Sequence, residues 1–265
     1  SSELSVGYFG SGTLTIQDGG AVSNTYSGYI GHQNGSTGVA TVTGAGSSWT
    51  NTPSLYVGYS GNGTLNIGDG GLVSNTNGYI GNGSGSTGAV TVAGATWNNS
   101  SDLSIGYLGN GTLTIQDGGT VTNTVGYLGV GTNSTGSAFV TGDNSIWTNS
   151  GSLYVGGHSM ASGGTGSLAV TDGGHVDVGG TLKTWNAGTV TLDGGSITTQ
   201  SFDKSVGTFN FHDGTLTIDG GTYTQPTGSL TINGNTATAN PTFVLANGAS
   251  TAGVSSVVVG DTNQG

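Results

Sequence analysis

The sequence predicts an all-β fold, a right-handed parallel β-helix (β-solenoid) of roughly ten rungs of about 24 residues each. Three observations lead to this prediction: glycine makes up 56 of the 265 residues, apolar residues alternate with polar ones, and a long segment repeats along the chain. Alternation with a period of two is typical of strands. Self-similarity at a fixed period of this length is typical of solenoids.

The repeat is clearest in the segment from Leu4 to Gly20, which returns at 55–71 and again at 103–119. Each long unit divides into two rungs, because asparagines recur at intervals of 24 to 27 residues. The predicted ladder consists of Asn24, Asn51, Asn75, Asn99, Asn123 and Asn149. A buried amide in such a ladder can bond to its copies one rung up and one rung down. We therefore interpret these asparagines as architecture.

Within a rung, three short strands are expected to alternate with three turns. Leu14 and Ile16 are separated by one polar residue, which is the strand spacing. Gly-x-Gly and Asp-Gly-Gly segments separate the strands and supply the positive-φ positions that turns need. The inward residues should then stack in ladders: Leu14, Leu65 and Leu113; Ile16, Ile67 and Ile115; and, from the alternate rungs, Val42, Val92 and Val140.

The regularity changes along the chain. We expect residues 1–178 to form regular two-rung repeats, and residues 179–265 to form a less regular continuation of the same solenoid, in one continuous domain. The intervals between Asp-Gly-Gly segments shorten after Val178. Pro241 cannot donate to a strand ladder, so a wider loop or an irregular rung is expected over 234–248.

Composition excludes several classes of partner. The formal net charge is −11, arginine is absent, and Lys183 and Lys204 are the two lysines. Such a chain cannot neutralise a row of phosphates, so nucleic acid is excluded as a partner. No apolar run is long enough to cross a bilayer, so direct membrane insertion is not expected. The absence of cysteine excludes disulfides and thiolate metal sites.

Six tyrosines suggest a ligand face. They are Tyr8, Tyr29, Tyr59, Tyr79, Tyr107 and Tyr127, and their shared Gly-Tyr-x-Gly setting predicts that they form one stack. If this stack faces solvent it can lie against sugar rings, and if it folds inward it closes a corner between strands. Three tryptophans, each two residues before a ladder asparagine, are interpreted as packing corners: Trp49, Trp97 and Trp147.

Other polar patterns are interpreted as structural. The Asp-Gly-Gly segments lack the nine-residue calcium-roll pattern and are typical of turns, so no metal and no cofactor are expected. Outward threonine pairs such as Thr13 and Thr15 resemble an ice-binding array, but Asn66, Phe139 and Ala169 interrupt it.

An enzyme remains an alternative, because parallel β-helices host polysaccharide lyases and hydrolases. A hydrolase needs two carboxylates roughly 5 to 10 Å apart. The candidates are Asp177, Asp203 and Asp213, with His175 expected on the same strand face as Asp177. We nevertheless predict that the chain is not an enzyme.

The segment 54–71, Ser-Leu-Tyr-Val-Gly-Tyr-Ser-Gly-Asn-Gly-Thr-Leu-Asn-Ile-Gly-Asp-Gly-Gly, is followed by Gly-Tyr-Ile-Gly and Trp-x-Asn. This pattern resembles the Gly-rich repeat of bacterial autotransporter (type V secretion) passengers and PEP-CTERM-associated exported proteins. The resemblance implies a surface-exposed or secreted bacterial β-solenoid. It covers the chain from Leu4 to about Val178.

The predicted function is therefore an extracellular structural or adhesive solenoid, acting as a stalk, fibre or surface-layer element of a bacterial cell surface. Its expected partners are further copies of the chain, through self-association of the solenoid ends, and a cell-surface glycan or a host surface. One alternative is a subunit that self-associates through the open solenoid ends into a filament, since unpaired strand edges are templates for further strands. A second alternative is a carbohydrate-active enzyme on the same scaffold.

Overall fold

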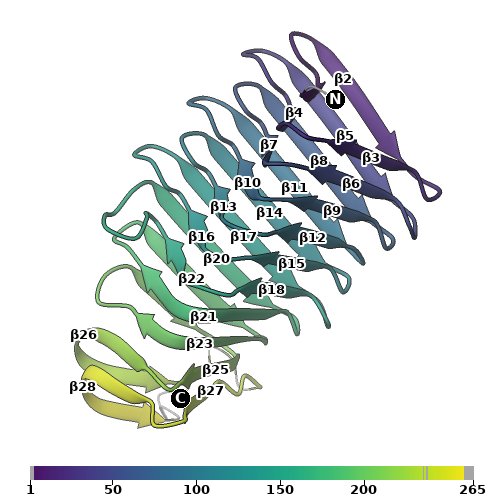
Figure 1. Cartoon of the computed structure of the whole chain (residues 1–265). Helices are drawn as coiled ribbons and strands as arrows, with labels where there is room; N and C mark the ends of the chain where they lie inside the picture. The colour runs from purple at the N-terminus through teal and green to yellow at the C-terminus, as the bar shows by residue number, and fades with distance from the viewer. Residues whose placement is uncertain (1–2, 235, 237, 260–265) are drawn as a thin grey trace.

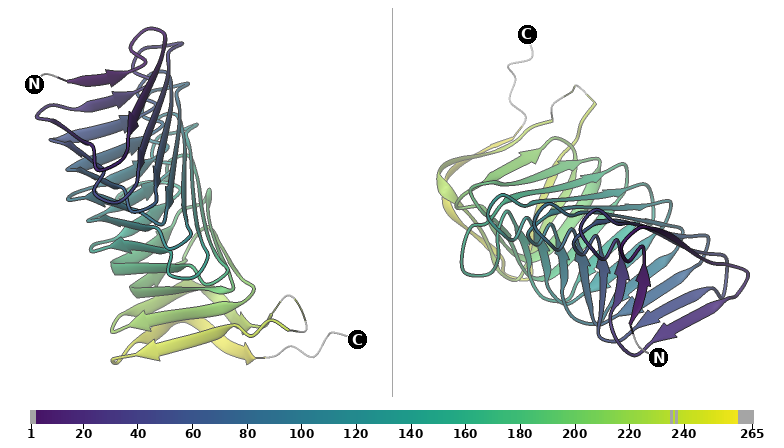
Figure 2. Two further views of the ribbon diagram at one scale, coloured as in Figure 1. Left: turned by 90° about the vertical axis from the view of Figure 1, so that its right-hand side faces the viewer. Right: turned by 90° about the horizontal axis from the view of Figure 1, so that it is seen from above.

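The computed structural model describes residues 3–234, 236 and 238–259 (Figure 1). The remaining positions of the predicted segments 1–178 and 179–265 lie outside the described residues. The described residues form a parallel β-solenoid of about 10 turns with about 25 residues per turn. They contain no helix, and therefore none that could cross a membrane. The predicted all-β parallel β-helix is confirmed, with the coils stacked along one axis (Figure 2).

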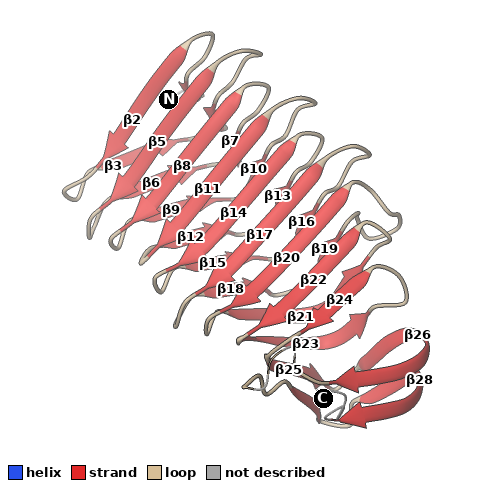
Figure 3. Cartoon of the chain, turned by 180° about the vertical axis from the view of Figure 1, so that it is seen from behind, coloured by secondary structure: helices blue, strands red, loops and turns tan. Residues whose placement is uncertain are grey.

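Each regular coil contributes one strand to each of three stacks. The first stack contains β1 (Leu4–Val6), β4 (Gly28–Ile30), β7 (Ser54–Val57), β10 (Asn77–Ile80), β13 (Leu103–Ile105), β16 (Gly126–Leu128) and β19 (Leu153–Val155). The second stack is a nine-stranded parallel sheet (Figure 3) made of β2 (Ser11–Ile16), β5 (Thr37–Thr43), β8 (Asn62–Gly68), β11 (Thr87–Ala93), β14 (Asn110–Gln116), β17 (Thr135–Thr141), β20 (Thr165–Thr171), β22 (Gly188–Asp193) and β24 (Thr208–Phe211).

The third stack contains β3 (Ala21–Asn24), β6 (Ser48–Asn51), β9 (Leu72–Asn75), β12 (Thr96–Asn99), β15 (Thr120–Asn123) and β18 (Ile146–Asn149). Two long strands, β21 (His175–Thr184) and β23 (Gly195–Asp203), then run from the third stack into the first stack of the next coil. The chain continues with β25 (Gly214–Asp219), β26 (Thr222–Ile232), β27 (Thr242–Ala246) and β28 (Ser250–Val259). A wider loop or an irregular rung was expected over 234–248. The structure has strand β27 in the second part of this segment, beginning directly after Pro241, where Thr242 pairs with Thr215.

Glycine shapes the turns between the strands. At the end of β1, Gly7 has a φ of 71°, and a Cβ at this position would lie 2.2 Å from the carbonyl oxygen of Thr37 in the next coil. Only glycine can combine this backbone conformation with such a close approach. The Asp-Gly-Gly turn after β2 has two successive left-handed residues, Asp18 (φ 55°) and Gly19 (φ 78°). Aspartate tolerates that conformation well, which explains its position before glycine.

The core consists of side chains from all three stacks. Leu65 pairs in register with Ala40 of the coil before and Val90 of the coil after, and all three are buried. Ile67 pairs in the same way with Val42 and Val92. The predicted ladders of leucine, isoleucine and valine are therefore confirmed, with large and small side chains alternating from one coil to the next.

The same alternation explains why the repeat unit contains two coils. In the fourth coil Trp97 is fully buried, and a Cβ on Gly78 would lie 2.4 Å from Asn99 Oδ1 and 3.0 Å from the Trp97 ring. In the fifth coil the same two positions carry Leu103 and Val121, also fully buried. One coil thus pairs tryptophan with glycine and the next pairs valine with leucine, so both fill the same cross-section.

Candidate functional site

Aromatic side chains gather on one long face, which we call the tyrosine face. It is formed by residues of the first stack and of the turn that follows it. The strand column contains Tyr29, Tyr56, Tyr79, Tyr127 and Tyr154. The turn column contains Tyr8, Tyr59 and Tyr107.

The six tyrosines predicted as one stack therefore belong to two columns, and that part of the prediction is wrong. The reason is the position of the left-handed glycine. Gly31 (φ 70°) stands two residues after Tyr29, so Tyr29 lies within strand β4. Gly7 (φ 71°) stands directly before Tyr8, so strand β1 has ended before Tyr8 is reached. Because Gly7 and Gly31 occupy the same turn position, Tyr8 lies beside His32, and their ring centroids are 4.8 Å apart.

Two further tyrosines of the face, Tyr56 and Tyr154, were not among the predicted residues. Both occur in Leu-Tyr-Val segments, at 55–57 and 153–155. These segments align with Gly-Tyr-Ile at 28–30 once the strands are paired. Comparing the two rungs of a unit strand by strand would have shown this signal.

Stacking fixes the geometry of the strand column. The ring centroids of Tyr29 and Tyr56 are 5.1 Å apart with an interplanar angle of 6°, and those of Tyr56 and Tyr79 are 4.8 Å apart at 9°. These separations match the spacing of neighbouring strands. Tyr59, from the turn column, meets Tyr29 and Tyr56 edge-on at 5.2 and 5.1 Å. The result is an ordered set of ring faces and ring edges.

The tyrosine face is partly open to solvent. Tyr8 and Tyr107 are exposed, as are Phe9 (75%) and Leu108 (48%) in the same turns. The strand-column rings are half-buried, and burial raises the pKa of Tyr56, Tyr79 and Tyr127. Rings that are accessible and held by their neighbours lose little freedom when a ligand packs on them.

The strand column is interrupted at Ser104. Tyr79, Ser104 and Tyr127 are successive register partners, so a serine stands where the neighbouring coils have tyrosine. A hollow of about 380 Å³ occupies this position. Its lining consists of Tyr79, Asp102, Ser104, Tyr107, Tyr127, Val130, His158 and Ser159. We call this hollow the Ser104 slot.

The six predicted ladder asparagines are all buried in the core, with exposed fractions of 6% or less. Hydrogen bonds join four of them in two pairs, while Asn24 bonds to Trp49 and the Asn51 amide has no partner among the described residues, so the predicted continuous ladder is not formed. Asn75 Nδ2 donates to Asn99 Oδ1 (2.6 Å), and Asn123 Nδ2 donates to Asn149 Oδ1 (2.7 Å).

Tryptophan indoles complete these asparagine pairs. Trp97 Nε1 donates to Asn75 Oδ1 (2.7 Å), and Trp147 Nε1 donates to Asn123 Oδ1 (2.7 Å). Asn99 Nδ2 donates to the backbone oxygen of Thr122 instead of to the next asparagine. The tryptophans are therefore buried packing residues that also supply a polar donor.

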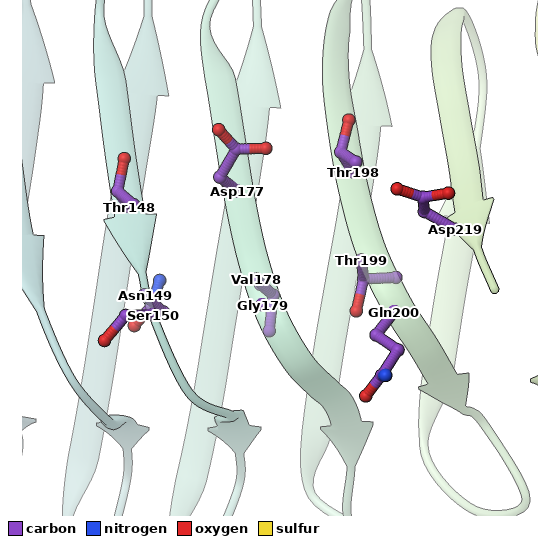
Figure 4. Close-up of a pocket in the computed structure, with 10 residues that line it drawn as sticks. All are labelled: Thr148, Asn149, Ser150, Asp177, Val178, Gly179, Thr198, Thr199, Gln200 and Asp219. Carbon is purple, nitrogen blue, oxygen red and sulfur yellow. The ribbon is translucent and has the colours of Figure 1, made fainter. Parts of the chain in front are cut away.

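A second hollow, of about 480 Å³, lies on the third stack (Figure 4). Thr148, Asp177 and Thr198 are register partners on successive strands and point into it. Asp219 is a second carboxylate in its lining. His175 Nε2 lies 3.1 Å from Asp177 Oδ1, so these two side chains share one strand face as expected.

The three carboxylates proposed for catalysis do not meet in this hollow. Asp203 forms an ion pair with Lys183, and Asp213 Oδ1 accepts hydrogen bonds from the backbone N–H groups of Gly214 (2.7 Å) and Asn240 (2.9 Å). Only Asp177 of the three lines the hollow. Across the part of the chain that the structure describes, no group of three or more histidine, aspartate or glutamate side chains is arranged to hold a metal ion.

No family model matches the chain, and no curated protein matches its sequence. Among solved structures, the chain is similar to the Tapirin C-terminal domain of Caldicellulosiruptor kristjanssonii. The sequences are 14% identical, the TM-score is 0.47, and the likeness covers 100% of this chain and 93% of the other.

Proposed function

We propose that the chain is an extracellular structural or adhesive β-solenoid of a bacterial cell surface, and that its tyrosine face lies against glycans. The observation that carries this proposal is the tyrosine face itself. Eight of the 10 tyrosines of the chain lie on it, in two columns that follow the solenoid axis. The proposal gives the chain no catalytic role.

The chemistry of the face suits a sugar chain. The C–H faces of a pyranose are apolar and weakly positive, and they pack on the electron-rich faces of aromatic rings. Tyr29, Tyr56 and Tyr79 offer such rings at a constant spacing, and their hydroxyl groups can exchange hydrogen bonds with sugar hydroxyls. A polymer lying along the axis can contact several coils at once, so weak contacts add up through multivalency.

The composition suits a structural role outside the cell. Lys183 and Lys204 are the two positions at which a trypsin-like protease can cut. Lys183 is half-buried and ion-paired with Asp203. A rod of this kind offers few sites for proteolysis.

The proposal is tested by retention on insoluble polysaccharides such as peptidoglycan, cellulose and chitin. The test variant is Tyr29→Ser/Tyr56→Ser, and serine is compatible with this column because Ser5 and Ser104 occupy it naturally. The matched control is Val39→Ser/Thr64→Ser, which changes the outer face of the second stack in the same two coils. Ser137 and Ser167 show that serine is accepted there.

We expect the intact chain and the control to be retained on at least one polysaccharide, and the test variant to lose about tenfold or more of its affinity. Equal retention of both variants would refute the tyrosine face as the contact surface. Absence of retention on every polysaccharide would refute the glycan partner.

A second candidate function, a self-associating filament subunit, is favoured by the outer edge of β28. Val257 and Val259 are 55% and 72% exposed on this edge strand. Exposed apolar edges are templates for another strand. Electron microscopy over a dilution series separates the candidates: elongating fibres support the filament, and rods of constant short length exclude it.

A further inference from the structure

We infer that the Ser104 slot binds a quaternary ammonium group of the choline type, between the faces of Tyr79 and Tyr127 and beside the carboxylate of Asp102. This inference goes beyond the proposed contact with glycans and does not depend on it. It rests on the dimensions of the slot, on the orientation of its walls and on an unmatched negative charge.

The dimensions follow from the strand spacing. Tyr79 and Tyr127 are separated by two coils, which is about 10 Å. A cation at the level of Ser104 therefore lies about 5 Å from each ring, within the roughly 6 Å over which cation–π attraction acts. Between any other two consecutive tyrosines of the column, such as Tyr29 and Tyr56 at 5.1 Å, no group of this size fits.

The walls are oriented as a cage. The ring of Tyr107 stands at 84° to the ring of Tyr79, with their centroids 6.0 Å apart. Tyr107 therefore forms a third wall, roughly perpendicular to the ring of Tyr79. Val130 adds an apolar contact from the next turn. Three aromatic walls and an apolar floor suit methyl groups that carry a dispersed positive charge.

The slot carries the carboxylate of Asp102, which forms no ion pair among the described residues, although His158 also lines the slot. Neither of the two lysines lines the slot, and Lys183 already pairs with Asp203. Burial raises the pKa of Asp102, against hydrogen bonds from Ser101 and the backbone of Val125 that lower it. The charge of Asp102 also raises the pKa of Tyr79 and of Tyr127, which lie on opposite sides of the slot.

The experiment titrates the full chain with tetramethylammonium and with choline at pH 8, well above the ordinary range of an aspartate carboxyl, because burial raises the pKa of Asp102. Binding is followed by isothermal titration calorimetry and by the NMR signals of the tyrosine rings. The control ligand is 3,3-dimethylbutan-1-ol, which has the shape of choline without its charge. We expect saturable binding of both cations, with a Kd of about 1 mM or below, and binding of the alcohol at least about tenfold weaker.

Two single variants test the walls and the charge separately. Ser104→Tyr restores the tyrosine that neighbouring coils carry at this position, so it fills the slot while keeping the pattern of the column, and binding should be lost. Asp102→Asn keeps the shape and removes the charge, and the affinity for the cations should fall about tenfold or more. Circular dichroism of both variants verifies that the fold is retained.

A second slot, built elsewhere in the strand column, tests whether these variants act on the slot itself or indirectly through the fold. In the Ser104→Tyr background, Tyr56→Ser opens the same kind of gap between Tyr29 and Tyr79, with Ser54 at the position that corresponds to Asp102. This gap alone should bind cations weakly, and adding Ser54→Asp should restore binding. Equal affinity for choline and its neutral analogue, or unchanged binding by Ser104→Tyr, would overturn the inference, as would no saturation up to about 50 mM.

Discussion

The pairing of Trp97 with Gly78 provides the most stringent test of how the two-coil repeat is packed. Trp97→Val and Gly78→Leu together convert the fourth coil into the pattern of its neighbours, in which Leu103 stands opposite Val121. Consecutive leucine coils already exist in this solenoid, since Leu153 and Leu182 are register partners. Each single change should therefore be harmful and the pair should be tolerated.

The magnitudes follow from burial and contact distances. Trp97 is fully buried, so replacing it with valine should cost about 2–4 kcal/mol for the cavity. The acceptor Asn75 Oδ1, which receives the Trp97 Nε1–H bond at 2.7 Å, is left unpaired at a further cost of about 1–3 kcal/mol. Gly78→Leu should cost about 3 kcal/mol, because even its Cβ would lie 2.4 Å from Asn99 Oδ1.

In the double variant the leucine fills the cavity and its clash with the indole disappears. The Asn99 amide can move away from the leucine into the space that the indole leaves, since Leu103 and Asn123 coexist at the equivalent positions of the fifth coil, so the unpaired Asn75 acceptor is the main remaining cost. We predict a total cost of about 1–3 kcal/mol, and hence a coupling energy of at least about 3 kcal/mol between the two positions. Urea unfolding gives the overall stability, and amide hydrogen exchange in β10 and β12 gives the stability of the fourth coil itself. Additive costs in the double variant would refute the volume-matching explanation.

Three further predictions concern stability. Asn123→Ala should lower the free energy of unfolding in urea by about 2–4 kcal/mol, because it removes the hydrogen-bond acceptor of Trp147 and the donor to Asn149. Asn51→Ala should lower it less, because the Asn51 amide has no hydrogen-bond partner among the described residues. Burial raises the pKa of Tyr223 to about 12. The neutral Tyr223 side chain therefore stabilises the fold fully below pH 10, and this stabilisation is lost as the pH rises toward 12. The melting temperature of Tyr223→Phe should accordingly fall less between pH 10 and pH 12 than that of the unaltered chain. The native chain should resist trypsin at Lys183, and rapid cleavage there on a gel would contradict the packed structure around it.

Most of the fold could be predicted because strand alternation and coil length can both be read directly from the spacing of residues along the chain. The spacing of Leu14 and Ile16 gives strand alternation, and the asparagine intervals give the coil length. Once coils with the same order of strands and turns stack, the register of Leu65 with its neighbours follows without further information. The tryptophan–glycine compensation was not predicted, because Trp97 and Gly78 belong to different stacks and meet only across the core.

The tyrosine face was predicted in part, for a comparable physical reason. Glycines flank Tyr8 and Tyr29 alike, and the sequence does not state which glycine takes the left-handed conformation. That one backbone angle decides whether the tyrosine lies in the strand or in the turn. The Ser104 slot depends on three coils at once, so it could not be identified before Tyr79, Ser104 and Tyr127 were known to be register partners.

The most direct test of the tyrosine face as the functional surface is an NMR titration of the chain, labelled at its tyrosine rings, with soluble oligosaccharides of the retained polysaccharide. Two rings serve as internal references, because Tyr223 is buried in the core and Tyr26 makes none of the ring contacts of the face. We predict shifts of the rings on the tyrosine face, and unchanged signals of Tyr26 and Tyr223. Shifts confined to these two references, or no tyrosine shift at saturating oligosaccharide, would contradict the proposed function.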